Sequence, residues 1–207
     1  RIFELLEDDF HYYIVSELLN GGELYERIVQ LKNSGKEMRI DYLLVVTGSK
    51  LHALTENKPG KDTLFNNHRD IKPENILLES SDLNNLNIKI TDFGFACFFD
   101  PQEGLKDVLG SPLYMAPEII KEGNMIKELT SGVVSYSYIL LSGRPPFRGK
   151  AKQEIFNSIE NSPLKFDHPV WERLSKESRE FIKVALEKDY NKRPSALQLL
   201  EHDWIKK

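Results

Sequence analysis

The pattern of apolar and polar positions changes from strand-like to helical along the chain. Aromatic and β-branched residues at Tyr12–Val15 predict a strand, and the following Asn20-Gly21-Gly22 predicts a turn. From Glu23 apolar residues recur with the spacing of one helix face, which predicts a helix that ends near Ser34-Gly35. A second helix is expected over Tyr42–Leu54, before the helix-breaking segment NKPGKDT.

Two further short strands are expected on either side of the polar turn SSDLNNLN, at Ile76–Leu78 and Ile88–Ile90. Glycine and proline punctuate the region from Phe93 to Pro117, which shows little periodicity and is expected to be a long ordered loop. Only helices are expected after this loop.

These later helices carry recognisable start signals. Ser175 is an expected N-cap, and Ser195 has capping-box spacing with Gln198. The expected stretches are Lys150–Ile159, Ser175–Glu187 and a last helix that begins at Ser195. The predicted fold class is therefore α+β, with a small strand-rich start and a mostly helical body.

Composition excludes several classes of protein. The 207 residues suffice for one domain or two small lobes, and 40% hydrophobic with 29% charged residues excludes wholesale disorder. The net charge of −4 argues against nucleic acid or an anionic membrane as a partner. The longest apolar stretch, Gly132–Leu141, is shorter than the ~18 residues that a membrane span needs.

The opening segment and the single cysteine indicate the cellular compartment in which the protein is expected. The opening RIFELLEDDF has no secretory signal, so the cytoplasm is the expected location. Because the chain begins with Arg1, it is expected to be part of a longer product. The one cysteine, Cys97, excludes an intrachain disulfide or a cysteine-based zinc site, and we expect it to be a small buried hydrophobe.

The most informative stretch is His68-Arg69-Asp70-Ile71-Lys72-Pro73-Glu74-Asn75. Pro73 blocks a regular helix, so Asp70, Lys72 and Asn75 are expected to lie on one loop. A carboxylate can accept a hydroxyl proton, an ammonium group can neutralise developing charge, and an amide oxygen can bind a hard cation. Such a group of side chains is suited to handling a phosphate.

Two more motifs follow in order. Asp92-Phe93-Gly94 places another oxygen ligand at the end of a strand, where Gly94 lets the backbone turn sharply. Ala116-Pro117-Glu118 comes later. Each tripeptide alone occurs by chance, whereas all three in this order, with a strand pair between the first two, rarely occur together by chance.

HRDIKPEN, DFG and APE resemble the catalytic loop, the metal-binding motif and the end of the activation segment of eukaryotic protein kinases. Further stretches, among them YYIVSELLNGGELYERI and GSPLYMAPEII, are similar to the calcium/calmodulin-dependent group, and most similar to calcium-dependent protein kinases of protists and plants. The resemblance implies an N-terminally truncated kinase domain. Residues 1–19 would form the end of its small lobe and the hinge, and residues 20–207 its helical large lobe.

The resemblance implies roles at the phosphate end of the site. Asp70 would orient or deprotonate the substrate hydroxyl, and Lys72 would contact the transferred phosphoryl group. Asn75 and Asp92 would hold Mg²⁺, and the phosphoryl donor would be ATP. His68, Arg69, Phe93 and Gly94 would have structural roles in the two motifs.

At the nucleoside end, the Glu17 carbonyl and the Leu19 amide would bind adenine, above Leu77. Ser16 would be a small gatekeeper that leaves access to a pocket behind the adenine. Glu23 would reach the ribose or a substrate arginine.

The resemblance also implies a serine/threonine kinase for protein substrates with basic motifs. Glu23 and Glu74 together suggest an arginine three residues before the acceptor, and a solvated or capping role is the alternative for either carboxylate. Ser111 resembles a substrate-loop hydroxyl rather than a switch. Glu118 and Arg193 resemble a structural ion pair that ties the activation segment to the helical lobe.

The sequence departs from the family pattern at four places. It contains no glycine-rich loop and no strand lysine with its glutamate partner. The segment TENKPGKDTLFNN before HRD is longer and more polar than in the family, and the stretch Lys127–Gly132 lacks the Asp-x-Trp-Ser-x-Gly pattern. No D-x-D-x-D-G loop is present, so we expect no calcium site within this chain.

Three functions remain open at this point. The first is an ATP-dependent serine/threonine kinase, and the second is a pseudokinase or kinase-lobe fragment that acts as a binding module. The third, a small-molecule kinase, is disfavoured by GSPLYMAPE, because this motif presents a peptide substrate in the family that it resembles.

No Ser, Thr or Tyr lies between Asp92 and Gly110, so Arg69 has no phosphate to clamp in this stretch. We expect a fixed acid at Asp100, Glu103 or Asp107 to replace this phosphate in part. We predict that phosphorylation of this stretch does not activate the protein. A phosphopeptide map that places an activating phosphate before Gly110 would refute this prediction.

Overall fold

The computed structural model describes residues 1–33, 68–82, 85, 87–96, 109–122 and 130–206. The expected helix over Tyr42–Leu54, the polar segment before His68, Cys97 and the acids at Asp100, Glu103 and Asp107 lie outside the described residues. The fold is α+β, as predicted, with two separate two-stranded antiparallel sheets and a helical body.

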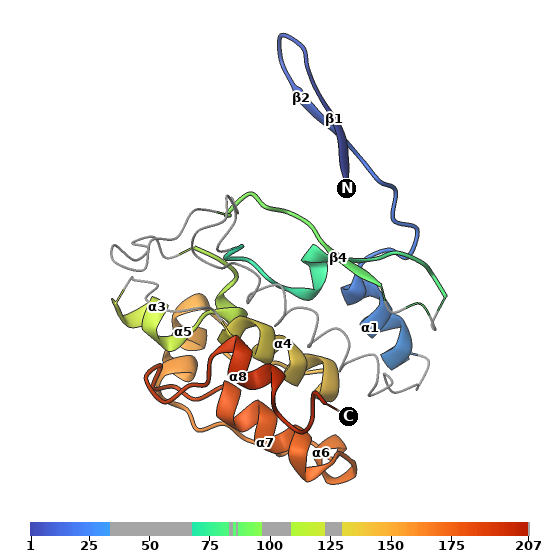
Figure 1. Ribbon diagram of the computed structural model, residues 1–207. Coiled ribbons are helices and arrows are strands. Elements are labelled where there is room, and N and C mark those ends of the chain that lie inside the picture. The colour runs from blue at the N-terminus through green and yellow to red at the C-terminus, as the bar shows by residue number, and fades with distance from the viewer. Residues whose placement is uncertain (34–67, 83–84, 86, 97–108, 123–129, 207) are drawn as a thin grey trace.

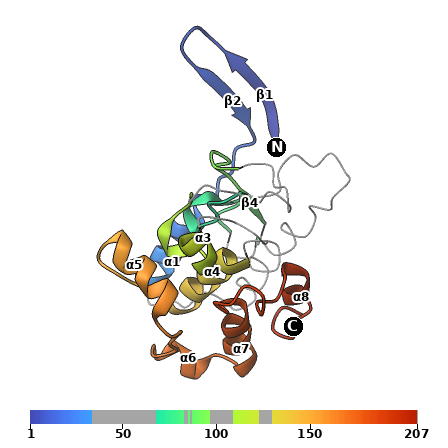
Figure 2. The same cartoon turned by 90° about the vertical axis from the view of Figure 1, so that its left-hand side faces the viewer.

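The chain begins with a hairpin that stands away from the helical body (Figures 1 and 2). β1 (Ile2–Glu7) pairs antiparallel with β2 (Tyr12–Ser16), so that Leu5 lies opposite Ile14 and Leu6 opposite Tyr13. β2 was predicted from its aromatic and β-branched residues. β1 was not, because its apolar residues do not alternate with polar ones.

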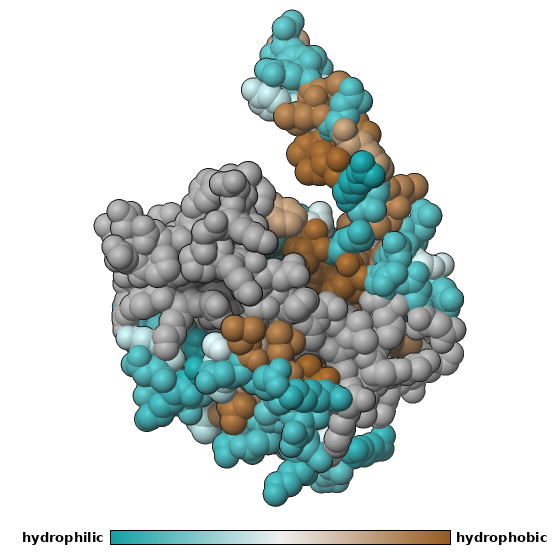
Figure 3. Space-filling view, viewed as in Figure 1, coloured by the Kyte–Doolittle hydropathy of each residue, from teal (hydrophilic) through white to brown (hydrophobic). Residues whose placement is uncertain are grey.

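Both faces of this hairpin are apolar and exposed. Successive strand residues point to opposite faces, so the Leu5–Ile14 pair lies on one face and the Leu6–Tyr13 pair on the other. Leu5 and Ile14 are 65% and 64% exposed, and apolar side chains cover much of the hairpin in Figure 3. An isolated two-stranded ribbon is only marginally stable in water, so this hairpin gains little from its own burial.

The second sheet sits in the body and carries the site. β3 (Ile76–Leu78) pairs antiparallel with β4 (Ile88–Ile90), which confirms both predicted strands. The turn after the hairpin joins this sheet through the hydrogen bond from Gly21 N to Leu78 O at 3.0 Å. A Cβ on Gly21 would lie 2.4 Å from the Leu78 Cβ, so only glycine permits this approach.

The first helix holds this sheet against the body. α1 (Leu24–Asn33) packs against β3 and against η1 (Pro73–Asn75), a short 3₁₀ turn that immediately precedes β3. Leu24 is fully buried, as are Ile76 and, almost completely, Leu78. The start of α1 matches the helix predicted from Glu23.

The rest of the chain forms the helical body (Figure 1). The region expected to be an irregular loop ends in η2 (Pro112–Tyr114), because proline suits the first position of a short helical turn. α5 begins two residues later than the predicted Lys150, since Lys150 N donates to the Glu154 side chain and Ala151 is extended. The helices are α3 (Pro117–Glu122), α4 (Thr130–Ser142), α5 (Lys152–Asn161), α6 (Val170–Arg173), α7 (Lys176–Ala185) and α8 (Ala196–Leu200).

Serine caps begin the last two helices as predicted. The Ser175 hydroxyl accepts a hydrogen bond from Ser178 N at 3.2 Å at the start of α7. At α8, Ser195 accepts from Gln198 N and its own N–H donates to the Gln198 side chain, which completes the capping box.

One hydrophobic core joins the helices to the second sheet. The ring centroids of Tyr138 and Trp171 lie 4.8 Å apart, as do those of Phe181 and Trp204. The core residues are Leu24, Ile76, Leu78, Tyr138, Leu140, Leu141, Trp171, Phe181, Ile182, Ala185, Leu186, Ala196, Leu199 and Trp204.

No described helix has both the length and the apolar character needed to cross a bilayer.

A buried ion pair joins α3 to the segment before α8. The two terminal guanidinium nitrogens of Arg193, Nη1 and Nη2, donate to the Glu118 carboxylate at 2.6 and 2.9 Å, and both side chains are almost fully buried. Arg193 Nε also donates to Glu187 O at 2.8 Å. The structure thus contains the contact that the family resemblance implies.

Breaking this pair should cost far more than breaking an exposed pair. Replacing Glu118 with Gln leaves the Arg193 charge buried without its counterion, and we expect a loss of about 3–5 kcal/mol in the free energy of unfolding. The measurement is urea unfolding followed by tryptophan fluorescence. The control is K192Q, which removes an exposed ion pair to Asp189 and should leave the unfolding midpoint unchanged. Equal effects of the two substitutions would contradict this assignment.

Candidate active site

The loop from His68 to Asn75 is held in a shape that gathers its polar side chains. Arg69 adopts a left-handed backbone with φ 62°, which turns the chain just before Asp70. Pro73 then opens the η1 turn, in which Asn75 N donates to Lys72 O at 3.0 Å. The loop therefore leads directly into β3, and its side chains stay close to the sheet.

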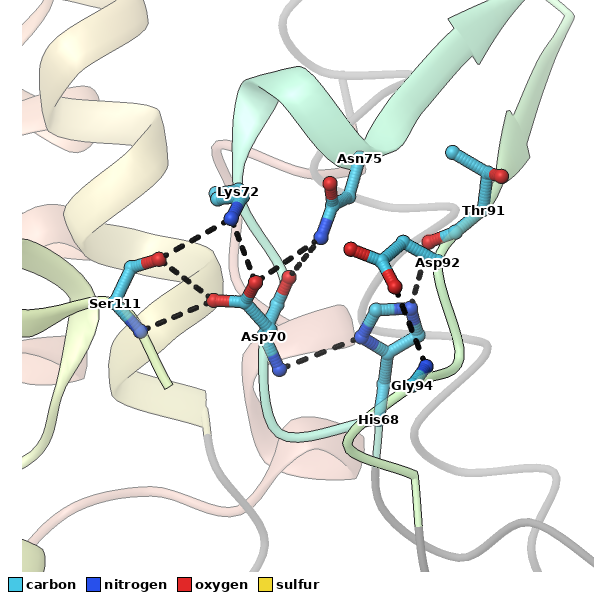
Figure 4. Close-up of polar contacts among 8 residues, drawn as sticks. All are labelled: His68, Asp70, Lys72, Asn75, Thr91, Asp92, Gly94 and Ser111. Carbon is cyan, nitrogen blue, oxygen red and sulfur yellow. Dashed lines mark hydrogen bonds and ion pairs between the residues drawn. The ribbon is translucent and has the colours of Figure 1, made fainter. Parts of the chain in front are cut away.

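The Asp70 carboxylate is the centre of the polar cluster in Figure 4. Its Oδ1 accepts from Ser111 N at 3.0 Å and from Ser111 Oγ at 2.7 Å. Its Oδ2 accepts from Lys72 Nζ at 2.7 Å and from Asn75 Nδ2 at 3.2 Å. Lys72 Nζ also lies 3.4 Å from Ser111 Oγ, so the carboxylate, the ammonium group and a hydroxyl are all in mutual contact.

These bonds decide the charge state of the cluster. Burial alone would raise the pKa of Asp70, but the donors Lys72 and Ser111 outweigh it and hold that pKa below its ordinary value. The bond to Asp70 raises the pKa of Lys72 above its ordinary value. Asp70 is therefore an anion and Lys72 a cation at neutral pH.

Gly110 brings Ser111 to this carboxylate. Its backbone has φ +112°, and a Cβ there would lie 2.5 Å from the Arg69 carbonyl oxygen. No other residue fits this approach without moving one of the two segments. Gly110 is a functional residue that the sequence analysis did not single out, and its place beside Ser111 at the start of GSPLYMAPE was the available signal.

Asp92 follows β4 and faces the same loop. Thr91 N donates to Asn75 O at 3.0 Å, and Thr91 O bonds His68 Nε2 at 2.9 Å, so two backbone groups fix the strand end to the loop. Asp92 has φ 61° and accepts from Gly94 N at 3.3 Å through Oδ1. Figure 4 shows the Asp92 carboxylate beside the Asn75 amide. Thr91 acts through its backbone, so its residue type gave no signal.

The donor set at Asp92 and Asn75 fits magnesium. Asn75 directs its amide nitrogen to Asp70 O at 2.9 Å, which leaves the amide oxygen turned elsewhere. Mg²⁺ prefers oxygen ligands and is commonly held by one or two protein groups together with substrate phosphates. Among the described residues no cluster of three His, Cys, Asp or Glu side chains occurs, so this is not an all-protein metal cage.

The remaining motif residues surround this cluster. The Phe93 ring lies 4.9 Å from the His68 ring, edge-on, and is 50% exposed. Arg69 Nε donates to Phe95 O at 2.5 Å, which attaches the HRD loop to the chain after DFG. The structure thus brings His68, Arg69, Phe93 and Gly94 together around the base of the site.

The residues expected at the nucleoside end are only partly gathered. Glu23 and Leu77, the residues expected at the ribose and the adenine, face each other in an antiparallel bridge and therefore lie close together. The Glu17 side chain pairs with Lys89 Nζ at 3.2 Å and with the amino group of Arg1, which leaves the prediction for its backbone carbonyl untested. Ser16 is exposed on β2, and Leu19 is exposed only in part.

Glu74 presents an unsatisfied acceptor near the cluster. Its Oε2 is buried and has no hydrogen-bond partner within the part of the chain that the structure describes. Burial and the nearby charge of Glu74 raise the pKa of Tyr114, so this phenol stays protonated at neutral pH. A buried carboxylate oxygen without a donor is costly, and this oxygen is closed to solvent.

Comparison with known proteins places this geometry in a family. The protein kinase domain model matches residues 1–205. The chain is 35% identical to a CDPK-related protein kinase of Daucus carota over its full length, and 36% identical to calcium-dependent protein kinase 8 of Arabidopsis thaliana over 98% of its length. It is also 35% identical over its full length to calcium-dependent protein kinase 4 of Plasmodium falciparum. The chain therefore belongs to the protein kinase domain family.

These matches cover only part of each relative. The chain corresponds to 33%, 36% and 38% of the carrot, Arabidopsis and Plasmodium proteins, respectively. It thus spans about a third of the length of the curated relatives that it matches.

The hydroxyl of Ser111 should set the pKa of Asp70. Replacing Ser111 with Ala removes a donor that favours the charged carboxylate, so the Asp70 pKa should rise toward its ordinary value. The measurement is a pH titration of the carboxyl ¹³C signal by NMR. The S111T variant keeps a donor and should preserve the low pKa, and S81A, at an exposed serine outside the cluster, should leave it unchanged. An unchanged Asp70 pKa in S111A would contradict the hydrogen-bond assignment.

Proposed function

We propose that this chain is the catalytic part of a serine/threonine protein kinase that transfers the γ-phosphoryl group of ATP. The observation that carries the proposal is the Asp70 carboxylate, which accepts a hydrogen bond from a serine hydroxyl at 2.7 Å beside the Lys72 ammonium group. A substrate hydroxyl in the same position would have both a proton acceptor and a positive charge at hand.

Each side chain of the cluster has a separate task in this proposal. Asp70 orients the acceptor hydroxyl and takes its proton, and Lys72 neutralises charge on the transferred phosphoryl group. Asn75 and Asp92 hold Mg²⁺, which neutralises phosphate charge and orients the phosphates when it is bound. The Glu17 carbonyl and Leu19 amide bind adenine, Leu77 lies beneath it, and Glu23 contacts the ribose.

The substrate that fits best carries an arginine three residues before the acceptor. Support comes from two carboxylates: Glu74, in the η1 turn beside Asn75, and Glu23, which forms a bridge with Leu77. A guanidinium group suits such carboxylates, because it offers several N–H donors with a full charge. Ser111 then lines the place where the acceptor residue sits.

A binding module is the second candidate function. The exposed apolar faces of the hairpin favour it, because they are surfaces that another polypeptide could cover. The chain also contains no glycine-rich loop and no strand lysine, which supply positioning and charge in the family that it resembles. In this alternative the polar cluster is retained but transfers phosphate poorly.

Phosphoryl transfer to an Arg-x-x-Ser peptide distinguishes the two candidates. With Mg-ATP as the donor, the chain should phosphorylate the peptide, and D70N should lower the rate by about 10²–10⁴-fold because general-base assistance is lost. Circular dichroism of both proteins shows whether they are folded. A folded wild-type chain that transfers no phosphate would contradict the kinase and support the binding module.

Glu74 should control the preference for arginine. In E74Q the carboxylate charge is removed, so the ratio of kcat/KM for Arg-x-x-Ser over Ala-x-x-Ser should fall by about tenfold or more, since a charge-assisted bond contributes about 1.5–3 kcal/mol. The rate with the alanine peptide should change little. An unaltered ratio would show that Glu74 does not recognise the substrate and would leave the phosphoryl-transfer proposal untouched.

A further inference from the structure

We propose that Ser111 is itself a phosphoryl acceptor, and that its modification within the same molecule switches the site off. This inference rests on the proposed kinase function and adds a form of regulation to it. It gives Ser111 a second role beside lining the substrate site.

The hydroxyl of Ser111 is already arranged as a nucleophile. Its proton is directed to Asp70 Oδ1 at 2.7 Å, and its oxygen lies 3.4 Å from Lys72 Nζ. An acceptor hydroxyl in general-base catalysis needs hydrogen-bond contact with the base, and Ser111 has this contact. Figure 4 shows that Ser111 approaches Asp70 from the side opposite Asn75.

The backbone holds this arrangement firmly. Ser111 N donates to the same Oδ1 at 3.0 Å, so the residue is bound to Asp70 by main chain and side chain together. Gly110, with a hypothetical Cβ only 2.5 Å from Arg69 O, keeps the two segments at van der Waals distance. Such positioning raises the rate of a reaction within one molecule relative to the same reaction between two molecules.

The reaction balances with the groups already named. Ser111 Oγ attacks the γ-phosphorus of a nucleoside triphosphate, a new O–P bond forms, and the bond from the γ-phosphorus to the bridging oxygen breaks. The nucleoside diphosphate leaves with that oxygen. The hydroxyl proton passes to Asp70 and then to solvent. The product is phosphoserine at position 111.

The product would block further transfer. A phosphoserine carries about −1.5 to −2 charges at neutral pH, and here it would stand beside the Asp70 carboxylate. Like charges at hydrogen-bond distance repel, and the phosphate would also draw Lys72 away from a second phosphoryl group. The modification should therefore be self-limiting at one phosphate on this serine, with loss of activity toward other substrates.

The test follows intact mass and phosphopeptides of the chain during incubation with Mg-ATP, alone and with the Arg-x-x-Ser peptide. The expected result is one phosphate on Ser111, formed at a first-order rate independent of protein concentration. The phosphate should be absent in D70N and S111A but present at position 111 in S111T. The exposed-serine control S81A should behave as the wild type. Activity toward the peptide should fall in proportion to the fraction that carries phosphate on Ser111.

Other outcomes separate this inference from the kinase proposal. Peptide phosphorylation with Ser111 unmodified overturns the inference and leaves the kinase proposal standing. A rate that rises with protein concentration overturns the reaction within one molecule. Phosphate at Ser111 without loss of peptide activity overturns the switch. If neither the peptide nor Ser111 is phosphorylated by a folded chain, both proposals fall.

Discussion

The buried charge of Asp70 is the constraint on which the rest of the site depends. A carboxylate taken out of water is costly unless donors surround it, and here they come from its own loop and from Ser111, 41 residues away. Satisfying this one group fixes the distance between two segments that share no regular secondary structure. The same bonds that stabilise the folded loop keep the carboxylate ionised, so structure and chemistry have a common cause.

The helical body supports this cluster, whereas the hairpin is not packed into the same body. Around the cluster, β3 is buried, α1 covers it, and the Glu118–Arg193 pair anchors the segment that continues from Ser111. The hairpin leaves apolar pairs exposed on both faces and reaches the second sheet through one described ion pair, between Glu17 and Lys89. The polar cluster around Asp70 is therefore supported by the helical body and the second sheet.

Local signals in the sequence predicted the elements that local interactions determine. β3, β4 and the caps at Ser175 and Ser195 could be predicted because short apolar stretches around a polar turn and hydroxyl caps are signals that act over a few residues. β1 could not be predicted, because apolar residues lie on both of its faces and the sequence does not alternate. α6 could not be predicted, because its four residues are too few to show a helical period.

The candidate site likewise has features that the sequence indicated and features that only the tertiary structure shows. The residue types at Asp70, Lys72, Asn75 and Asp92 indicated phosphate chemistry from their spacing alone. The contact between Asp70 and Ser111 depends on how Gly110 approaches Arg69, and the orphan oxygen of Glu74 depends on burial. Both are tertiary properties, which a pattern of residue types along the chain does not contain.

In the proposed kinase, Asn75 and Asp92 hold a divalent cation with a nucleotide next to Asp70. Paramagnetic broadening of the Asn75 side-chain amide signals in NMR, with Mn²⁺ and ADP added together to the whole chain, tests this arrangement. We expect these signals to broaden selectively and the broadening to be lost in D92N, while the side-chain amide of Asn161, on α5, stays sharp. Asn75 signals that remain sharp, or that broaden equally in D92N, would contradict it.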